Sequence, residues 1–438
     1  MIGSYFVYDL PASTEDNLLE RFTRSGKMSV GTFEYYFNLL YSVYSLPNIL
    51  LPLFFGWLID ATGTRAMLML LNTFLILGHA AVTLGCFIRS MPLMLFGRAV
   101  FGLGGESLNV AATVVLSEYF GRKEMAMALA FNLCTARAGS VLNDFISPVI
   151  ADMFGAPAAF SLGFGLLIIC GGVTILLIRL DIWVENEIAR SNPGMVQAPT
   201  KHGELKLGLA GLVQHVRHLP GLFWIACLVC GTVYASILPF NNVASALLVE
   251  EYFKGKKTGG VAAAREAAGQ TMSLVFASAA LLSPIAGVLT DKLGFRTEQC
   301  VLSGGLLVGA FTLLLPFSRA AMIPPEAAMI LLGLAYTIFA TVIWPCVGTS
   351  VGEDQRGMAY GTATAVQNLG LFLTPLAVAT VRAETGSFAA VVWLFLGIAV
   401  VGLFSSFGLL AYDRATGSRL EGRRVNSPGV VELVGGAF

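Results

Sequence analysis

Long apolar runs joined by short polar connections alternate along most of the chain. A helix that spans a membrane needs about 20 predominantly apolar residues, and eleven runs have about this length. In hydrocarbon every backbone polar group must be satisfied within the protein, so these runs predict helices. The predicted spans are Phe33–Leu58, Ala66–Ile88, Pro92–Tyr119, Met125–Met153, Ala158–Leu180, Pro220–Val249, Thr271–Thr290, Cys300–Phe317, Pro324–Val351, Met358–Val381 and Ser387–Tyr412.

The composition agrees with this pattern and excludes most soluble classes of protein. Of the 438 residues, 56% are hydrophobic and 12% are charged, whereas a soluble globular protein has roughly 25% charged residues. The formal net charge of zero gives no reason to expect a nucleic-acid partner. The predicted fold class is therefore an all-α membrane protein, and the lipid bilayer is its first predicted partner.

Nothing in the residue pattern indicates an enzyme. No Ser-His-Asp set, phosphate-binding loop or metal-ligand spacing stands out in the sequence. The seven cysteines lie almost entirely in apolar runs, and the lone CxxC spacing, Cys227 to Cys230, falls inside a predicted helix. Cysteines in such positions act mainly as packing residues. We therefore predict no cofactor and no metal.

One long polar stretch, Asp181–Leu219, divides the apolar runs into two groups. It is rich in charged residues, as expected of a connection outside the membrane. The predicted organisation is an N-terminal transmembrane half (1–180), a cytoplasmic linker (181–219), a C-terminal transmembrane half (220–412) and a cytoplasmic tail (413–438).

The two halves share a ten-residue motif, which indicates an internal repeat. GWLIDATGTR (56–65) and GVLTDKLGFR (287–296) both read GxxxDxxGxR. The first glycine permits close helix packing, and the aspartate can cap the following helix and pair with the arginine of the motif. Together with an arginine inside a later span, the motif residues are the predicted gating or structural residues: Asp60, Arg65, Arg98, Asp291 and Arg296.

The distribution of positive charge gives the expected orientation. Cytoplasmic loops carry an excess of Lys and Arg. The side that holds the two GxxxDxxGxR loops contains more of these residues than the other side. We therefore expect the motif loops, the linker and the tail to be cytoplasmic.

The two halves do not match at their beginnings. In the second half the motif follows the second predicted helix, whereas in the first half it follows the first one. The preceding apolar segment, Ile2–Tyr8, is too short to span, and residues 9–27 are largely polar. We expect the first helix to be truncated at the N-terminus, by a misassigned start or as a shortened product.

Two opposite charges lie within predicted spans. Glu106 belongs to the glycine-rich stretch GRAVFGLGGESLN (97–109), and Arg137 belongs to the next span. A charge in the bilayer core costs about 2.5–3.5 kcal/mol on insertion scales, so it is kept with a partner or a function. The pair can form the two poles of a site for a zwitterion, or an ion pair that only fixes two helices. Asp144, which shares a helix face with Arg137, can instead neutralise it.

Further polar and aromatic residues fall at helical spacing in the same spans. Each polar side chain needs a partner in the bilayer, either a watery cavity or a hydrogen bond between helices. The aromatic residues can line a pocket or serve packing. The resulting candidates for substrate binding, besides Glu106 and Arg137, are Tyr41, Tyr44, Asn109, Asn241, Trp344 and Gln367.

Several segments resemble one known family. They are GSYFVYDLPA (3–12), LLYSVYSLPN (39–48), FGRAVFGLGGESL (96–108), ARAGSVLN (136–143) and GMAYGTATAVQNLGL (357–371). They are similar to the lysosomal dipeptide transporter branch of the major facilitator superfamily, and the resemblance covers nearly the whole chain. The GxxxDxxGxR repeats resemble the superfamily's loop between its second and third helices.

The resemblance implies a fold of two six-helix halves and transport of dipeptides by uniport with alternating access. It implies that Glu106 holds the amino terminus of the peptide and that Arg137 holds its carboxylate. It further implies a lysosomal or vacuolar membrane, with the plasma membrane as an alternative, and a glycosylated single-span accessory subunit as partner.

Two other functions stay open at this point. A proton-coupled carrier of single amino acids or other small organic ions would use the same two charges at a shorter separation. A membrane sensor or scaffold that transports nothing would tolerate changes of both charges.

Overall fold

The computed structural model describes residues 1–24, 28–120, 124–191, 216–253, 260–317 and 321–421, and in these ranges the regular elements are all helical. The expectation of an all-α protein is thus confirmed. Most of the predicted linker (192–215) and most of the predicted tail (422–438) lie outside the described residues.

The first half of the chain contains eight α-helices and one short 3₁₀ helix within the described residues. They are α1 (Ile2–Ser13), α2 (Glu15–Thr23), α3 (Val30–Ser45), η1 (Pro47–Ile49), α4 (Leu51–Thr62), α5 (Thr64–Ile88), α6 (Met91–Tyr119), α7 (Met125–Phe154) and α8 (Ala156–Ser191). The largely polar stretch, residues 9–27, is helical over most of its described part.

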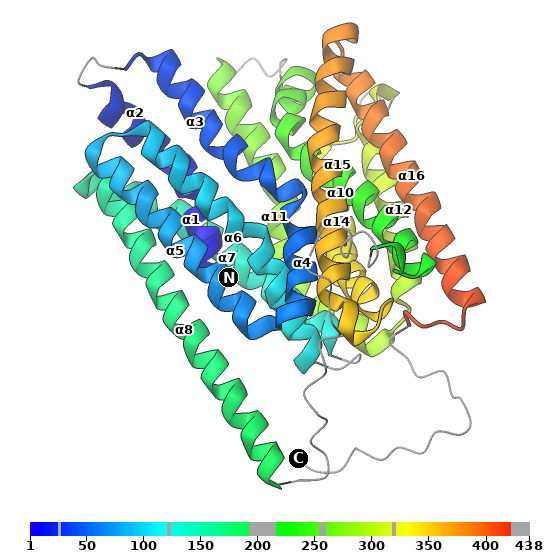
Figure 1. Ribbon diagram of the computed structural model, residues 1–438. Helices are drawn as coiled ribbons and strands as arrows, with labels where there is room; N and C mark the ends of the chain where they lie inside the picture. Colours follow the sequence, from blue (N-terminus) through cyan, green and yellow to red (C-terminus); the bar gives the residue numbers. More distant parts are fainter. Residues whose placement is uncertain (25–27, 121–123, 192–215, 254–259, 318–320, 422–438) are drawn as a thin grey trace.

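The second half repeats this arrangement on the other side of the molecule (Figure 1). Its described elements are α10 (Gly221–Leu248), η2 (Val249–Phe253), α11 (Gly260–Leu293), α12 (Arg296–Leu313), α14 (Pro325–Thr349), η3 (Glu353–Gln355), α15 (Arg356–Thr385) and α16 (Phe388–Ala415).

Nine helices of the described residues are long and apolar enough to cross a membrane, and a bent pair, Tyr35–Ile49 with Leu51–Thr62, makes a tenth. The predicted run Cys300–Phe317 does not reach this standard. It falls on α12, a helix of 18 residues whose first turn holds Arg296 and Glu298. The count of apolar spans is therefore lower than the eleven expected from the sequence.

The first predicted span, Phe33–Leu58, is broken rather than continuous. α3 and α4 meet at 50° across the 3₁₀ turn that begins at Pro47. The bend lies between Ile49 and Leu51, and the prolines on its two sides, Pro47 and Pro52, have no backbone N–H with which to continue the helical hydrogen bonds. Hydrogen bonds compensate for the break: the Asn48 side chain donates to the Tyr44 carbonyl at 2.7 Å, and Asn368 of the other half donates to the Asn48 carbonyl at 2.6 Å.

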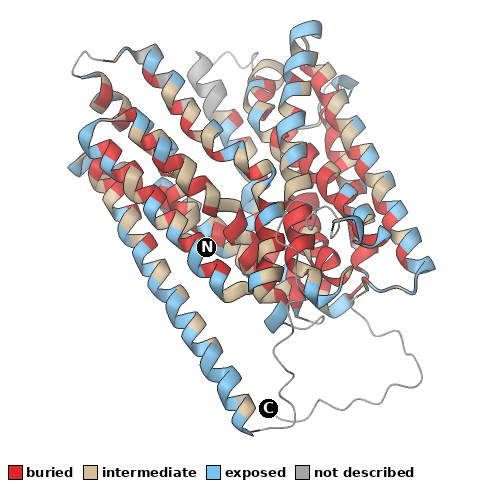
Figure 2. Cartoon of the chain, viewed as in Figure 1, coloured by how far each residue is buried: buried red, intermediate tan, exposed pale blue. Residues whose placement is uncertain are grey.

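α8 continues past the expected end of its span at Leu180 to Ser191. Its 36 residues correspond to roughly 54 Å, more than the ~30 Å of a hydrocarbon core. Figure 2 shows much of its length exposed, as expected of a helix on the periphery of the bundle. Asp181 and Glu185, on the extension, both bind Arg65.

The halves meet along pairs of helices, of which α4–α15 and α7–α11 are the most extensive. Glycines permit the closest approach. A side chain on Gly56 would overlap the backbone carbonyl of Gly357, and one on Gly361 would overlap the carbonyl of Pro52. These contacts lie beside the GxxxDxxGxR loops, at what we call the motif end of the bundle, so the halves are closed there.

Candidate functional site

Glu106 lies in the middle of α6 and faces a group of tyrosines from two other helices. The charge of Glu106 acts on Tyr5 and Tyr8 of α1 and on Tyr44 of α3. The ring of Tyr44 lies 4.7 Å from that of Tyr8, centroid to centroid. Gly105 makes this arrangement possible, because a side chain there would overlap the Tyr44 hydroxyl. The tyrosines are the polar, uncharged part of the surroundings of Glu106.

Arg137 extends from α7 toward the opposite half. Its Nη2 donates a hydrogen bond to the hydroxyl of Tyr336 on α14 at 3.1 Å. Its guanidinium carbon lies 5.7 Å from the centroid of the Phe276 ring on α11. The basic pole therefore belongs to the N-terminal half by sequence and to the boundary between the halves by position.

Glu106 and Arg137 are close enough for their charges to interact. However, no ion pair within 4.0 Å joins them among the described residues, where such pairs include Asp291–Arg296 and Glu250–Arg382. The alternative of a Glu106–Arg137 lock between two helices is thus absent from this conformation. Neither charge is neutralised by a direct ion pair with the other.

The carboxylate beside Arg137 is not the one that the helix spacing suggested. Asp144 accepts a hydrogen bond from Asn143 at 3.2 Å. Asp9 of α1 is a second acidic residue, besides Glu106, whose charge acts on Arg137, and it lies beside Ser140. Sequence reasoning missed Asp9 because only tertiary packing brings α1 against α7. The sequence did contain one indication of its importance, since Asp9 is a charged residue among the apolar residues of α1.

Aromatic residues of the second half line the region around Tyr336. The ring of Tyr234 on α10 lies 6.3 Å from that of Tyr336 in an edge-to-face arrangement. Trp344 donates from Nε1 to the Tyr234 hydroxyl at 3.1 Å. Trp344 is thus connected to the basic pole through Tyr234 and Tyr336, two residues outside the predicted substrate-binding set.

The remaining candidates differ in how well their polar atoms are satisfied. Both side-chain atoms of Asn241 on α10, and the hydroxyl of Tyr41 on α3, are buried without a hydrogen-bond partner in the described part of the chain. Asn109 on α6 and Gln367 on α15 are partly exposed, and no hydrogen bond to either side chain occurs among the described residues. Asn241 is seven residues from Tyr234, hence on the same face of α10.

Arg98 has a structural environment. It is 1% exposed and donates to the backbone carbonyl of Tyr8 at 2.6 Å. Its guanidinium also lies 5.2 Å from the centroid of the Tyr41 ring. These contacts hold α1 and α3 against α6, so Arg98 positions the helices around Glu106.

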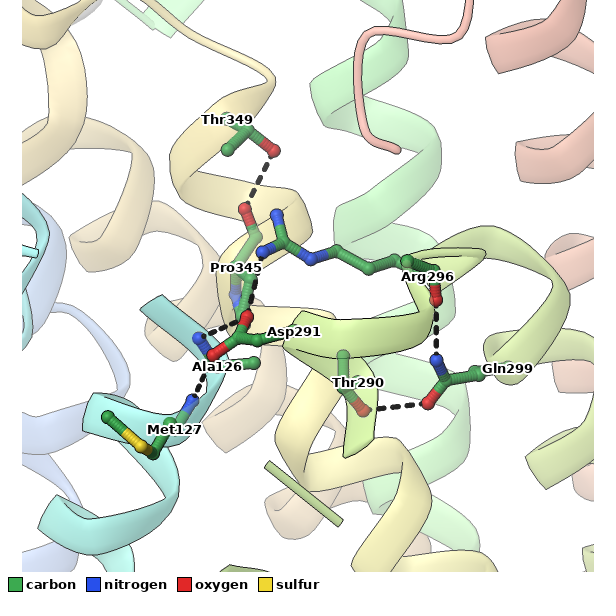
Figure 3. A network of polar contacts seen from close by, with 9 residues as sticks. Ala126, Met127, Thr290, Asp291, Arg296, Gln299, Pro345 and Thr349 are labelled. Carbon is green, nitrogen blue, oxygen red and sulfur yellow. Dashed lines mark hydrogen bonds and ion pairs between the residues drawn. The ribbon is translucent and has the colours of Figure 1, made fainter. Parts of the chain in front are cut away.

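The motif aspartates bind the opposite half, and our expectation that they cap the following helix is wrong. Asp60 accepts from the backbone N–H groups of Gly357 and Met358, at the start of α15, at 2.7 and 2.6 Å. Asp291 accepts from those of Ala126 and Met127, at the start of α7, at 3.1 and 2.7 Å. Figure 3 shows Asp291 pointing toward α7. The first N–H groups of a helix have no partner within that helix. Because the halves approach closely, each motif aspartate binds these groups on a helix of the opposite half instead of those on the helix that follows it in sequence.

The motif arginines behave differently from each other. Arg296 bonds Asp291 at 3.2 Å, as expected. Arg65 pairs with Asp181 and Glu185 of α8 instead. A third arginine at this end, Arg356, joins the halves by donating to the Ser117 carbonyl at 2.7 Å. It lines a cavity of about 440 Å³ between the ends of α6 and α14.

Comparisons of the sequence with known proteins give a single picture. The pattern of the Major Facilitator Superfamily matches residues 27–375 and also 240–433. The chain is 31% identical over 425 residues to the lysosomal dipeptide transporter MFSD1 of Homo sapiens, covering 95% of this chain and 85% of that protein. Its identity to the Mus musculus protein of the same name is 28% over 430 residues, covering 95% and 85%.

Solved structures of low sequence identity share the fold. The transporter FucP in its outward conformation superimposes with a TM-score of 0.67 at 11% identity, over 93% of this chain and 97% of that one. The human organic anion transporter MFSD10 does so with a TM-score of 0.60 at 15% identity, over 93% and 96%.

Proposed function

The chain belongs to the Major Facilitator Superfamily and is a membrane transporter, and from this premise we propose that it carries dipeptides by uniport, holding the peptide by both termini. The observation that carries the proposal is the pair of opposite, mutually unbonded charges at Glu106 and Arg137. A dipeptide zwitterion presents the complementary charges at its two ends. The similarity to proteins named lysosomal dipeptide transporters supports this substrate class.

The two poles suit the termini chemically. Arginine offers a planar set of N–H donors that binds a carboxylate in a bidentate manner. Glu106 accepts hydrogen bonds from an ammonium group, and the tyrosines around it add neutral oxygen atoms. The termini are the constant features of every dipeptide, so a site that holds them accepts many different side chains.

Asn241 favours a peptide over a single amino acid. Its amide carries one donor group and one acceptor group that are both buried without a partner among the described residues. A side-chain amide complements a peptide bond, because it can donate to the carbonyl and accept from the N–H. A site built to bind such groups discriminates strongly against an analogue that lacks them.

The closed motif end supports alternating access. Asp60 and Asp291 each hold a helix N-terminus of the opposite half, and rocking of the halves has to break these bonds. Gly56 and Gly361 let the halves come together again. Substrate bound between Glu106 and Arg137 is then exposed on one side of the membrane at a time.

The proposed location is the lysosomal membrane or an equivalent acidic vacuole, in keeping with the names of the relatives. A glycosylated single-span accessory subunit remains a predicted partner. The sequence has no Asn-x-Ser/Thr acceptor site of its own, so a glycosylated partner would supply protection from luminal proteases.

Thermal stabilisation of the purified full-length protein by a panel of dipeptides tests the substrate class. Ligand that binds only the native state raises the melting temperature. We expect a shift with dipeptides, loss of the shift in Glu106→Gln and Arg137→Ala, and no shift with N-acetylated or C-amidated peptides. Asp144→Asn is the matched control, since it removes a carboxylate on the Arg137 helix that bonds Asn143.

A shift with single amino acids or organic anions, and none with any dipeptide, would contradict the proposal. Uptake into proteoliposomes across a pH gradient tests uniport separately. We expect equilibration without accumulation, and accumulation driven by the gradient would indicate proton coupling instead.

A further inference from the structure

Tyr336 is the acceptor that Arg137 holds in this structure, and the bond between them joins the two halves. The distance from Arg137 Nη2 to the Tyr336 hydroxyl is 3.1 Å, and 199 residues separate the two in sequence. Tyr336 is 3% exposed. A polar bond at the centre of the boundary between moving halves has to be remade in each transport cycle.

Three groups can take part in remaking this bond: the Arg137 guanidinium, the Tyr336 phenol and the carboxylate of the substrate. A guanidinium only donates hydrogen bonds and a carboxylate only accepts them, whereas a phenol does both. Arg137 is charged in both bonds, but a carboxylate adds an opposite full charge and can accept two parallel N–H bonds from a guanidinium, whereas the phenol adds neither. A substrate carboxylate therefore replaces the phenol as the acceptor from Arg137.

We propose that Tyr336 couples carboxylate binding to closure of the halves: the arriving carboxylate takes the N–H of Arg137, and the Tyr336 hydroxyl turns from acceptor to donor toward that same carboxylate. The substrate then bridges α7 and α14 in place of the direct bond. This inference rests on the proposed function, and it assigns to the second half a contact with the peptide's carboxylate.

Packing around Tyr336 transmits the contact to the rest of the second half. The ring of Tyr234 holds it edge to face at 6.3 Å. The neighbouring residue on α14, Ala335, accepts a hydrogen bond at its carbonyl from Ser303 of α12 at 2.8 Å. α12 begins at Arg296, the partner of the gate residue Asp291, so α14 is tied to the helix that starts at the second motif.

Tyr336→Phe in proteoliposomes tests the inference, because it removes the hydroxyl and keeps the ring. Arg137 still supplies the charge-assisted bond and no longer has a competing acceptor. We therefore expect the half-saturating dipeptide concentration to stay within about threefold, while the maximal transport rate falls at least tenfold. A purely structural role would lower the melting temperature without separating binding from rate.

Tyr412→Phe is the matched control. It removes a hydroxyl from a partly exposed tyrosine (41%) on α16, away from both poles, and we expect wild-type values. A maximal rate of Tyr336→Phe within twofold of the wild type would overturn the inference, as would a fall in rate that only parallels weaker binding. Absence of dipeptide binding to the wild-type protein would instead contradict the proposed function itself.

Discussion

The two copies of GxxxDxxGxR share one contact and differ in another. Asp60 and Asp291 each accept from two backbone N–H groups at the start of a helix in the opposite half, α15 and α7 respectively. The arginines that close the motifs diverge. The Arg296 side chain is 0% exposed and bonds its own motif aspartate, whereas that of Arg65 is 40% exposed and bonds α8.

The difference comes from what covers each loop. The second loop is covered by the end of the described chain: Glu421 accepts from the Phe295 N–H at 3.2 Å, and Leu420 beside it is fully buried. The first loop has the extension of α8 beside it, with two carboxylates that reach Arg65. The repeat thus preserves the contact between the halves, while the neighbouring segments decide the role of the arginine.

The Glu421 carboxyl is itself partly buried, and it lies beside Glu298. Both its burial and its neighbour Glu298 raise the pKa of Glu421 above its ordinary range. Leu420 and Glu421 cover the second motif loop, and the first loop has no such cover from this segment. The loop of the second copy is therefore the more enclosed of the two motif loops.

The largest expected effect on transport comes from the backbone contact of the first copy, and the two effects after it are on thermal stability. Gly56→Ala places a methyl group against the Gly357 carbonyl, and neither backbone can move without opening the motif end. We expect transport to fall more than tenfold, equivalent to about 1.4 kcal/mol or more against closure. Gly165→Ala is the control, since a side chain there meets nothing within 4 Å; equal transport by the two variants would contradict the role of Gly56.

The next effect is a difference in thermal stability between variants of the two motif aspartates, Asp60 and Asp291. Asp291→Asn removes the charge that faces fully buried Arg296, and loss of one partner of a buried pair costs about 3–5 kcal/mol. Asp60→Asn weakens charge-assisted bonds to two N–H groups, and Asp291→Asn weakens the same number of such bonds in addition to breaking the buried pair. We expect a larger fall in melting temperature for Asp291→Asn. The reverse order would show that the two copies are not distinguished by burial of the arginine.

The smallest effect concerns the exposed arginine. Arg65→Ala removes two partly exposed ion pairs to α8, and such pairs contribute about 0.2–1 kcal/mol each. We expect a small decrease of melting temperature that shrinks further at high salt, because screening weakens exposed pairs. Transport should be nearly unchanged. A loss as large as that of Asp60→Asn would place Arg65 in the gate itself.

Much of the fold could be predicted from the sequence. Apolar run length gave the helices, because hydrocarbon leaves no other way to satisfy the backbone, and the family assignment is confirmed. The break between α3 and α4 was not predicted, although the prolines were visible. Hydropathy measures composition along a run and carries no information on direction, so a bend of 50° leaves it unchanged.

The candidate site divides in the same way. Glu106 and Arg137 were identifiable because charges in apolar helices are costly. Tyr336 and Asp9 became candidates only through their contacts with Arg137. The partner of each motif aspartate was also beyond sequence reasoning, since the nearest helix N-terminus in space lies in the other half.

The sequence by itself determined the class of protein, the duplication of its halves and the two charged poles, because each depends on the local cost of placing residues in a bilayer. The tertiary structure alone decided which groups lie near those poles and which helix of the opposite half each motif aspartate binds. Those choices depend on short-range hydrogen bonds between residues more than 100 positions apart, such as Asp291 to Met127. The spacing of residues along the chain does not reveal which of these distant residues come close together in space.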